Sequence, residues 1–342
     1  MNIKNALDQL LDAFDLFPPS SQKSTMLYDS NKLQRILLEK EALLIFKDQE
    51  QINKLDSISG KFGSLTSIMH KDPELAYTEY KILEQTDLHP LDEYNYLYVK
   101  QWVLSVEALY YYKIKNFNRA FNLSLECISL CDMMINMGLK TLILRLIEQN
   151  KNLARIYLVN GYHQKSRELE EDILNYLFNG EQTLLFGTSV RDSKNWLSVE
   201  YIREGYSYEY FRGVIHNLIT LKKSNKEKGE IFLDIFKNMK FAVNTPDRKI
   251  IRDWLDLFIL FYSESYEMFV EQLTQLLQVE TSSIYDILKI LALVNLKFII
   301  EQANYHASGK INNLIGSSAG INHLVPKMQG KQFCYTLIML NS

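Results

Sequence analysis

The sequence is poor in the residues that make turns, with 13 glycines and 6 prolines among 342 residues. An all-β chain needs a turn about every 8–12 residues, so this scarcity argues against a β-sandwich or barrel. Cysteine is scarcer still, with 3 residues, an odd number. The sequence therefore predicts no disulfide framework.

Charge of one sign and long apolar runs are also missing. The formal net charge is −3, which gives no overall field for nucleic acid or an anionic membrane. The longest apolar stretch, 287–300, is interrupted by Lys289, Asn295 and Lys297, and aspartates break the apolar pattern of the first 20 residues. We therefore expect a cytoplasmic protein with no nucleic-acid partner, no membrane partner and no secretory signal.

Residue patterns that carry chemistry are lacking as well. The six histidines are scattered, and the sequence contains neither a zinc-binding HExxH segment nor a glycine-rich phosphate loop. Cys127 and Cys131 would share one face of a helix, which we interpret as a pair of buried structural thiols. The sequence predicts no catalytic residues, no cofactor and no metal. An all-α enzyme whose site is assembled from distant residues stays an alternative.

What the chain does have is apolar residues at three- and four-residue steps. Asp72-Pro73-Glu74 is a typical helix start, because Asp is a good N-cap and Pro fits the first helical position. The helix it opens should end before His89. The other predicted helices span 32–56, 92–114, 118–137, 140–159, 163–178, 196–222, 227–240, 247–262, 266–278 and 283–303. With no alternating strand pattern, the fold class should be all-α.

Two segments lack the helical period, 179–195 and the residues from 308 onward. We expect a loop or irregular insertion in the first and an irregular cap or poorly ordered tail in the second. The expected organisation is N-terminal helices over 1–60 that cap or extend the fold, helical repeats over 61–305, and an irregular tail over 306–342.

Two helix pairs resemble the tetratricopeptide repeat, in which small residues let two helices approach closely and aromatics fill the wedge between neighbouring pairs. The matching residues are Ala108, Tyr111, Phe117, Ala120 and Cys127 in one copy, and Ala154, Tyr157, Gly161 and Ser166 in the other. The spacing between copies exceeds the about 34 residues of a strict repeat, so the chain resembles a long, degenerate form over about 60–300. The resemblance implies a right-handed α-α superhelix, a solenoid of antiparallel helix hairpins.

The resemblance also implies where a ligand would bind. Bacterial cytoplasmic proteins with similarly degenerate repeats bind proteins or peptides, some of them as regulators. The first helix of each hairpin would line the concave face, and the candidate groove residues are Trp102, Tyr112, Lys151, Asn152 and Arg155, with Ser105, Leu109 and Glu148 beside them.

Three of these residues, Lys151, Asn152 and Arg155, share one side of a helix. Two cations and an amide there could hold a peptide carboxylate, although the sequence shows no matching cations in the other repeats. A solvated basic patch is the alternative reading. The many tyrosines also have two interpretations: they pack between repeats, or some of them line the groove.

We therefore expect a non-catalytic scaffold that binds a protein or peptide. A regulatory sensor that binds a signalling peptide is the alternative, although residues 1–31 are too short and too acidic for the DNA-binding helix-turn-helix that such regulators often carry. The expectation depends on close helix approach at Ala108/Ala120 and at Ala154/Ser166.

Overall fold

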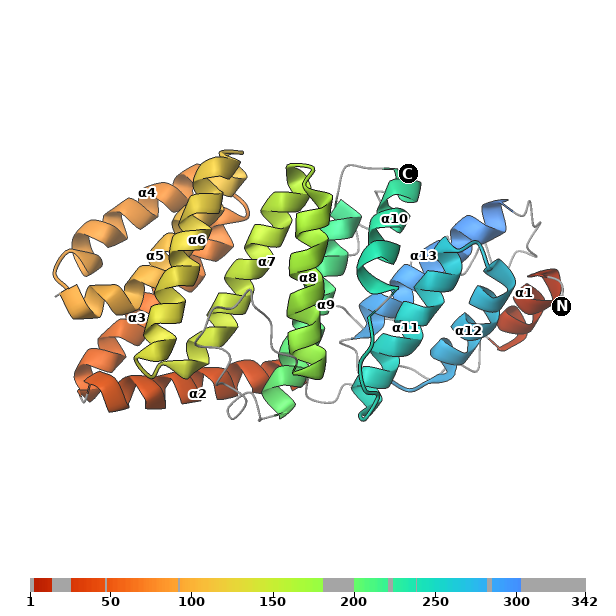
Figure 1. The fold of residues 1–342 in the computed structure, drawn as a ribbon, viewed down its shortest axis with the longest axis horizontal. Coiled ribbons are helices and arrows are strands. Elements are labelled where there is room, and N and C mark those ends of the chain that lie inside the picture. Colours follow the sequence, from red (N-terminus) through yellow and green to blue (C-terminus); the bar gives the residue numbers. More distant parts are fainter. Residues whose placement is uncertain are drawn as a thin grey trace. The chain divides into compact units, whose positions relative to one another are not determined.

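A computed structural model describes residues 3–13, 26–46, 48–91, 93–180, 200–220, 224–237, 239–281 and 285–302. All regular structure within these ranges is helical, and they contain no strand, which confirms the all-α class (Figure 1). No helix in these ranges is long and apolar enough to cross a membrane. The predicted tail 306–342 and residues 181–195 of the predicted loop lie outside the described residues.

The contacts group the chain into two compact units, one formed by residues 26–217 and the other by 1–25 together with 218–342. The unit 26–217 contains α2 (Met26–Phe46), α3 (Gln49–Met69), α4 (Pro73–Leu83), the π-helical turn η2 (Glu84–Leu88), α5 (Glu93–Lys113), α6 (Phe117–Asn136), the 3-10 turn η3 (Lys140–Leu142), α7 (Ile143–Val159), α8 (His163–Asn179) and most of α9 (Glu200–Thr220). The other unit contains α1 (Ile3–Ala13), α10 (Asn225–Phe236), α11 (Pro246–Tyr262), α12 (Tyr266–Gln278) and α13 (Asp286–Gln302). The predicted division at residue 60 falls inside α3.

Capping residues set several of the helix starts. The Asp72 carboxylate accepts a hydrogen bond of 3.0 Å from the backbone N–H of Leu75 and Pro73 is the first helical residue, as predicted. The single helix predicted over 32–56 is wrong, because Asp48 has an extended backbone and caps α3 through the N–H groups of Glu50 and Gln51. The apolar spacing continues across this break, so the periodicity alone did not reveal it.

Successive helices of the unit 26–217 pack on one another, α5 on α6, α6 on α7 and α7 on α8, and they lie side by side in chain order in Figure 1. Ala108, Ala120, Ala154 and Ser166 are all buried, as the predicted close approach requires, and for the second pair the Ser166 hydroxyl reaches the carbonyl oxygen of Ala154 at 2.9 Å. The turn between α7 and α8 is tight, with Gly161 at φ 80°, a left-handed conformation that favours glycine.

The second unit has an aromatic core between α10 and α11. Trp254 is completely buried among Phe232, Phe258 and their neighbours. Its indole Nε1 donates a hydrogen bond of 2.8 Å to the carbonyl oxygen of Leu288, which ties α11 to α13. Helix α1 packs on α12, so residues from the two ends of the sequence share this unit.

Candidate functional site

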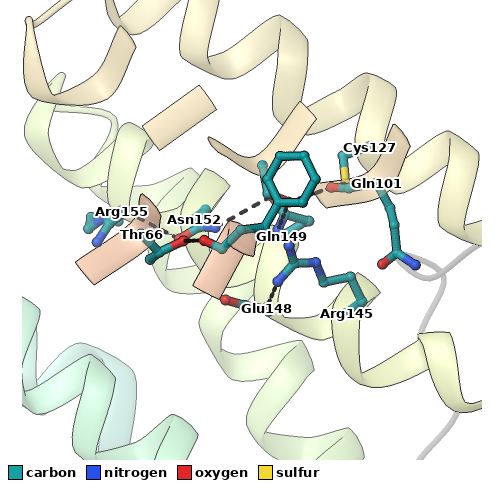
Figure 2. Close-up of polar contacts among 10 residues, drawn as sticks. Thr66, Gln101, Cys127, Arg145, Glu148, Gln149, Asn152 and Arg155 are labelled. Atoms are coloured by element: carbon teal, nitrogen blue, oxygen red, sulfur yellow. Dashed lines mark hydrogen bonds and ion pairs between the residues drawn. The ribbon is translucent and has the colours of Figure 1, made fainter. Parts of the chain in front are cut away.

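The structure brings together predicted site residues from α5 and α7. The guanidinium carbon of Arg155 lies 4.4 Å from the centre of the Tyr112 ring, a cation–π contact between the two helices. Nη2 of Arg155 donates a hydrogen bond of 3.2 Å to Oδ1 of Asn152 (Figure 2). Tyr112, Asn152 and Arg155 are all half-buried, so each is anchored and still reaches the surface.

A chain of hydrogen bonds continues beneath Asn152, from α7 to α5. Nδ2 of Asn152 donates to Oε1 of Gln149 at 3.4 Å, and Nε2 of Gln149 donates to the Ser105 hydroxyl at 2.9 Å. That hydroxyl in turn donates to the carbonyl oxygen of Gln101 at 2.7 Å. Gln149 is fully buried and was not among the predicted site residues, although a glutamine between apolar helix positions is a signal for such a bridge. The network fixes how α5 and α7 sit against each other.

The two other predicted site residues, Lys151 and Trp102, contact neighbours outside this network. Lys151 turns towards α9, where its Nζ lies 5.9 Å from the centre of the Tyr210 ring and the end of its side chain packs against Gly213. Lys151 and Arg155 therefore reach neighbouring helices on opposite sides of α7. Trp102 precedes Tyr112 by ten residues, about 15 Å along α5, and its ring packs edge-to-face with that of Tyr98 at 5.3 Å.

An ion pair occupies the start of the same face of α7. Nη1 of Arg145 donates a hydrogen bond of 2.6 Å to Oε2 of Glu148. Burial raises the pKa of Glu148, but the charges of Arg145, Lys151 and Arg155 outweigh burial and the pKa lies below its usual value. The Glu148 side chain is nevertheless 52% exposed.

Two further basic residues, Lys113 and His70, are within electrostatic range of Arg155. Lys113 is the last residue of α5 and His70 is the C-cap of α3. Burial lowers the pKa of Lys113 and the charge of Arg155 lowers it further. Burial, Lys113 and Arg155 all lower the pKa of His70. His70, Lys113 and Arg155 come from α3, α5 and α7, which are distant in sequence.

Behind this face lies a buried pair of titratable side chains. Glu170 of α8 is 1% exposed and Tyr210 of α9 is 3% exposed. Neither Oε1 of Glu170 nor the Tyr210 hydroxyl has a hydrogen-bond partner among the described residues. Burial raises the pKa of Glu170 to about 8, opposed by the charge of Lys151, and burial and Glu170 raise that of Tyr210. Because both side chains are enclosed, this pair offers a substrate no direct access.

Cys127 and Cys131 are free and buried, which confirms the reading of two buried thiols. The Cys127 thiol donates to the carbonyl oxygen of Gln101 at 3.3 Å, so it belongs to the same α5–α6 packing. Among the described residues, no three histidine, cysteine or acidic side chains gather as a metal site would need.

Comparison with known proteins gives no relative for this arrangement. No protein-family model matches the chain, and neither does any curated protein or solved structure. The resemblance to the tetratricopeptide repeat therefore stays a prediction from the residues themselves.

Proposed function

We propose that this chain is a non-catalytic cytoplasmic scaffold that binds an extended peptide segment of a partner protein. The binding face is formed by α5, α7 and α9 of a tetratricopeptide-like solenoid. We call it the α7 face and define it by Tyr112, Glu148, Lys151, Asn152 and Arg155. No cofactor and no metal take part in this proposal.

The single observation that carries the proposal is the contact between Arg155 and Tyr112. It joins one predicted groove residue from each of two successive hairpins, as is expected if the first helices of neighbouring hairpins line one surface. Lys151 extends the same relation to α9 through Tyr210 and Gly213.

The chemistry of the α7 face suits a peptide. Tyr112 offers a rigid ring with a hydroxyl, a combination that binds well at low entropic cost. Asn152 and Arg155 offer an amide and a guanidinium, which recognise backbone carbonyls and carboxylates through directional hydrogen bonds. The Gln149–Ser105 hydrogen bond holds both helices before a ligand arrives, which lowers the cost of ordering the site on binding.

A random peptide library, displayed on phage and panned against the full chain, tests the proposal. Enriched peptides are then synthesised with a fluorescent label, and their binding is measured by anisotropy. We expect Tyr112→Ala and Asn152→Ala each to weaken binding by at least about tenfold, since each removes a contact worth about 1.4 kcal/mol or more.

Tyr162→Ala is the matched control. Tyr162 is an exposed tyrosine on the turn between α7 and α8, and its ring packs on Tyr157 rather than on the α7 face. Its replacement should leave the affinity unchanged. Failure to enrich any peptide, or an equal loss of affinity in Tyr162→Ala, would contradict the proposal.

A further inference from the structure

We propose that the exposed face of α4 is a second binding surface, which docks a basic amphipathic helix of a partner protein. We call it the α4 face and define it by Glu74, Leu75, Glu79 and Ile82. This surface goes beyond the proposed function, since it lies on another helix and uses none of the residues of the α7 face.

The apolar part of the α4 face is a pair of aliphatic side chains on one side of the helix. Leu75 is 48% exposed and Ile82 is 57% exposed. They are seven residues apart, so they lie almost in line at about 10 Å along the helix. The opposite side of α4, which carries Ala76, Tyr80 and Leu83, is buried. One exposed leucine is ordinary, whereas an aligned pair at this spacing forms a stripe on which a second helix can pack.

Carboxylates flank this stripe on both sides. Glu79 lies about 40° around the helix from Leu75 in one direction, and Glu74 lies about 100° in the other. Both carboxylates are exposed. Glu74 is also held in place, because the Tyr110 hydroxyl of α5 donates to its two oxygens at 3.2 and 3.3 Å. The Tyr110 ring stacks on Tyr77 of α4 at 4.0 Å, so this side of the α4 face is ordered before a ligand arrives.

The charge of this part of the chain selects a basic partner. Residues 72–88 carry five carboxylates and one lysine, which is more net negative charge than the −3 of the whole chain. Two of the five carboxylates have a cation of their own, Glu84 with Lys81 at 2.9 Å and Asp87 with Lys61 at 2.7 Å. The two carboxylates of the α4 face form no ion pair with a described residue. Their charge is therefore available to lysines or arginines that flank the apolar side of a partner helix.

The same charge argues against the other partners that an apolar helix face could have. A second copy that docks through its own α4 face would bring Glu74 and Glu79 of the two chains together, and like charges across an interface are unfavourable. Nucleic acid and an anionic membrane surface are repelled for the same reason. A basic amphipathic helix fits, since its apolar residues recur at the seven-residue spacing of Leu75 and Ile82 and its cations meet the flanking carboxylates.

Fluorescence anisotropy with two labelled peptides tests the proposal on the full chain. The peptides have equal length and the same leucines at i, i+3, i+4 and i+7, and the remaining positions are lysine in one and glutamate in the other. At about 50 mM salt we expect the lysine peptide to bind at least about tenfold more tightly than the glutamate peptide. Its affinity should fall by at least about threefold at about 300 mM salt, because salt screens the exposed charges.

Variants with a matched control locate the binding. Leu75→Ala and Ile82→Ala should each weaken binding of the lysine peptide by at least about fivefold. Leu125→Ala should change it by less than about twofold, although Leu125 of α6 is exposed to a similar extent, 41%. Glu79→Lys should weaken binding of the lysine peptide and strengthen that of the glutamate peptide, an exchange that loss of structure would not produce. Circular dichroism melting curves establish that each variant is folded.

Two binding results would overturn the proposal: equal affinity for the two peptides, or an equal loss in Leu75→Ala and Leu125→Ala. Sedimentation velocity supplies a third. If the chain forms a dimer that Ile82→Glu converts to a monomer, a second copy covers the α4 face and the proposed helix does not dock there.

Failure of the α4 face is distinguishable from failure of the proposed function. Leu75→Ala should leave unchanged the affinity of library peptides that bind the α7 face. A loss of that affinity would mean that the two surfaces are one, which contradicts a second binding surface.

Discussion

The Ser166 hydroxyl of α8 donates a hydrogen bond of 2.9 Å to the carbonyl oxygen of Ala154 in α7. Both side chains are buried. A side-chain hydroxyl as short as that of serine reaches the backbone of a neighbouring helix only where the two helices are unusually close. The small residues at 154 and 166 therefore set the distance between α7, which carries the proposed binding face, and α8 behind it.

Ala154→Leu should destabilise the protein by about 1–3 kcal/mol, because the larger side chain overpacks this contact. Ser166→Ala should cost about 1 kcal/mol, since it removes one hydrogen bond while the Ala154 carbonyl stays part of helix α7. Urea unfolding followed by circular dichroism measures both. Equal stability of Ala154→Leu and the unchanged protein would show that the helices are not in close contact there.

Gly229→Ala should destabilise the other unit by about 1–3 kcal/mol. Gly229 is buried in α10, and a Cβ atom at this position would overlap the ring of Tyr262 in α11. In a Tyr262→Ala background the cost should disappear, which a double-mutant cycle by urea unfolding would detect.

Gly60→Ala is the matched comparison for that substitution and should have the opposite effect. Gly60 lies inside α3 with nothing within 4 Å of an added Cβ. Alanine there should stabilise the protein by about 0.5–1 kcal/mol, because it restricts the unfolded chain and suits a helix. A destabilised Gly60→Ala variant would contradict the packing of α3.

Glu170→Gln should change how stability depends on pH. Burial raises the pKa of Glu170 to about 8 from an ordinary value of 4.5, so the folded protein holds a proton that the unfolded chain releases. Stability from this group is therefore fully present below about pH 4.5 and is lost as the pH rises to about 8. Relative to the unchanged protein, Glu170→Gln should gain roughly 4 kcal/mol between pH 4.5 and pH 8.

The control for this experiment is Glu168→Gln, which removes an exposed carboxylate two residues away on the same helix. Its unfolding free energy should follow that of the unchanged protein across this pH range. A parallel pH dependence in Glu170→Gln would mean that Glu170 is ionised in the folded protein across this pH range, as it is in the unfolded chain.

The effects of Tyr112→Leu and Arg155→Met on the free energy of unfolding should be coupled. The cation–π contact between these residues predicts a coupling free energy of about 0.5–2 kcal/mol, according to how far the contact is desolvated. Unfolding of the two single variants and the double variant measures it. Additive effects would show that α5 and α7 do not meet through these side chains.

Helix positions were predictable because their signals are local. Asp72-Pro73 marks a helix start by capping chemistry that needs nothing beyond the next few residues. The break at Asp48 was missed although Asp is also a good cap, because apolar residues continue at helical spacing on both sides of it. A cap residue inside a periodic stretch is ambiguous, since an exposed aspartate in a continuous helix produces the same pattern.

The candidate site was predictable in part. Tyr112, Asn152 and Arg155 are brought together as the resemblance implied, whereas Lys151 turns to α9 and Trp102 packs on Tyr98. Helical spacing shows which side of α7 a residue occupies. It does not show which neighbour a long, flexible side chain reaches, and Lys151 and Arg155 diverge for that reason.

The order of residues alone determined the all-α class, most helix ends and the small residues that let α7 and α8 approach, because periodicity, capping and residue size act within a few positions of the chain. The tertiary structure alone decided that Arg155 stacks on Tyr112, and that Glu170 is buried beside Tyr210. These partners are about 40 or more residues apart, and only packing of whole helices brings such groups within electrostatic range.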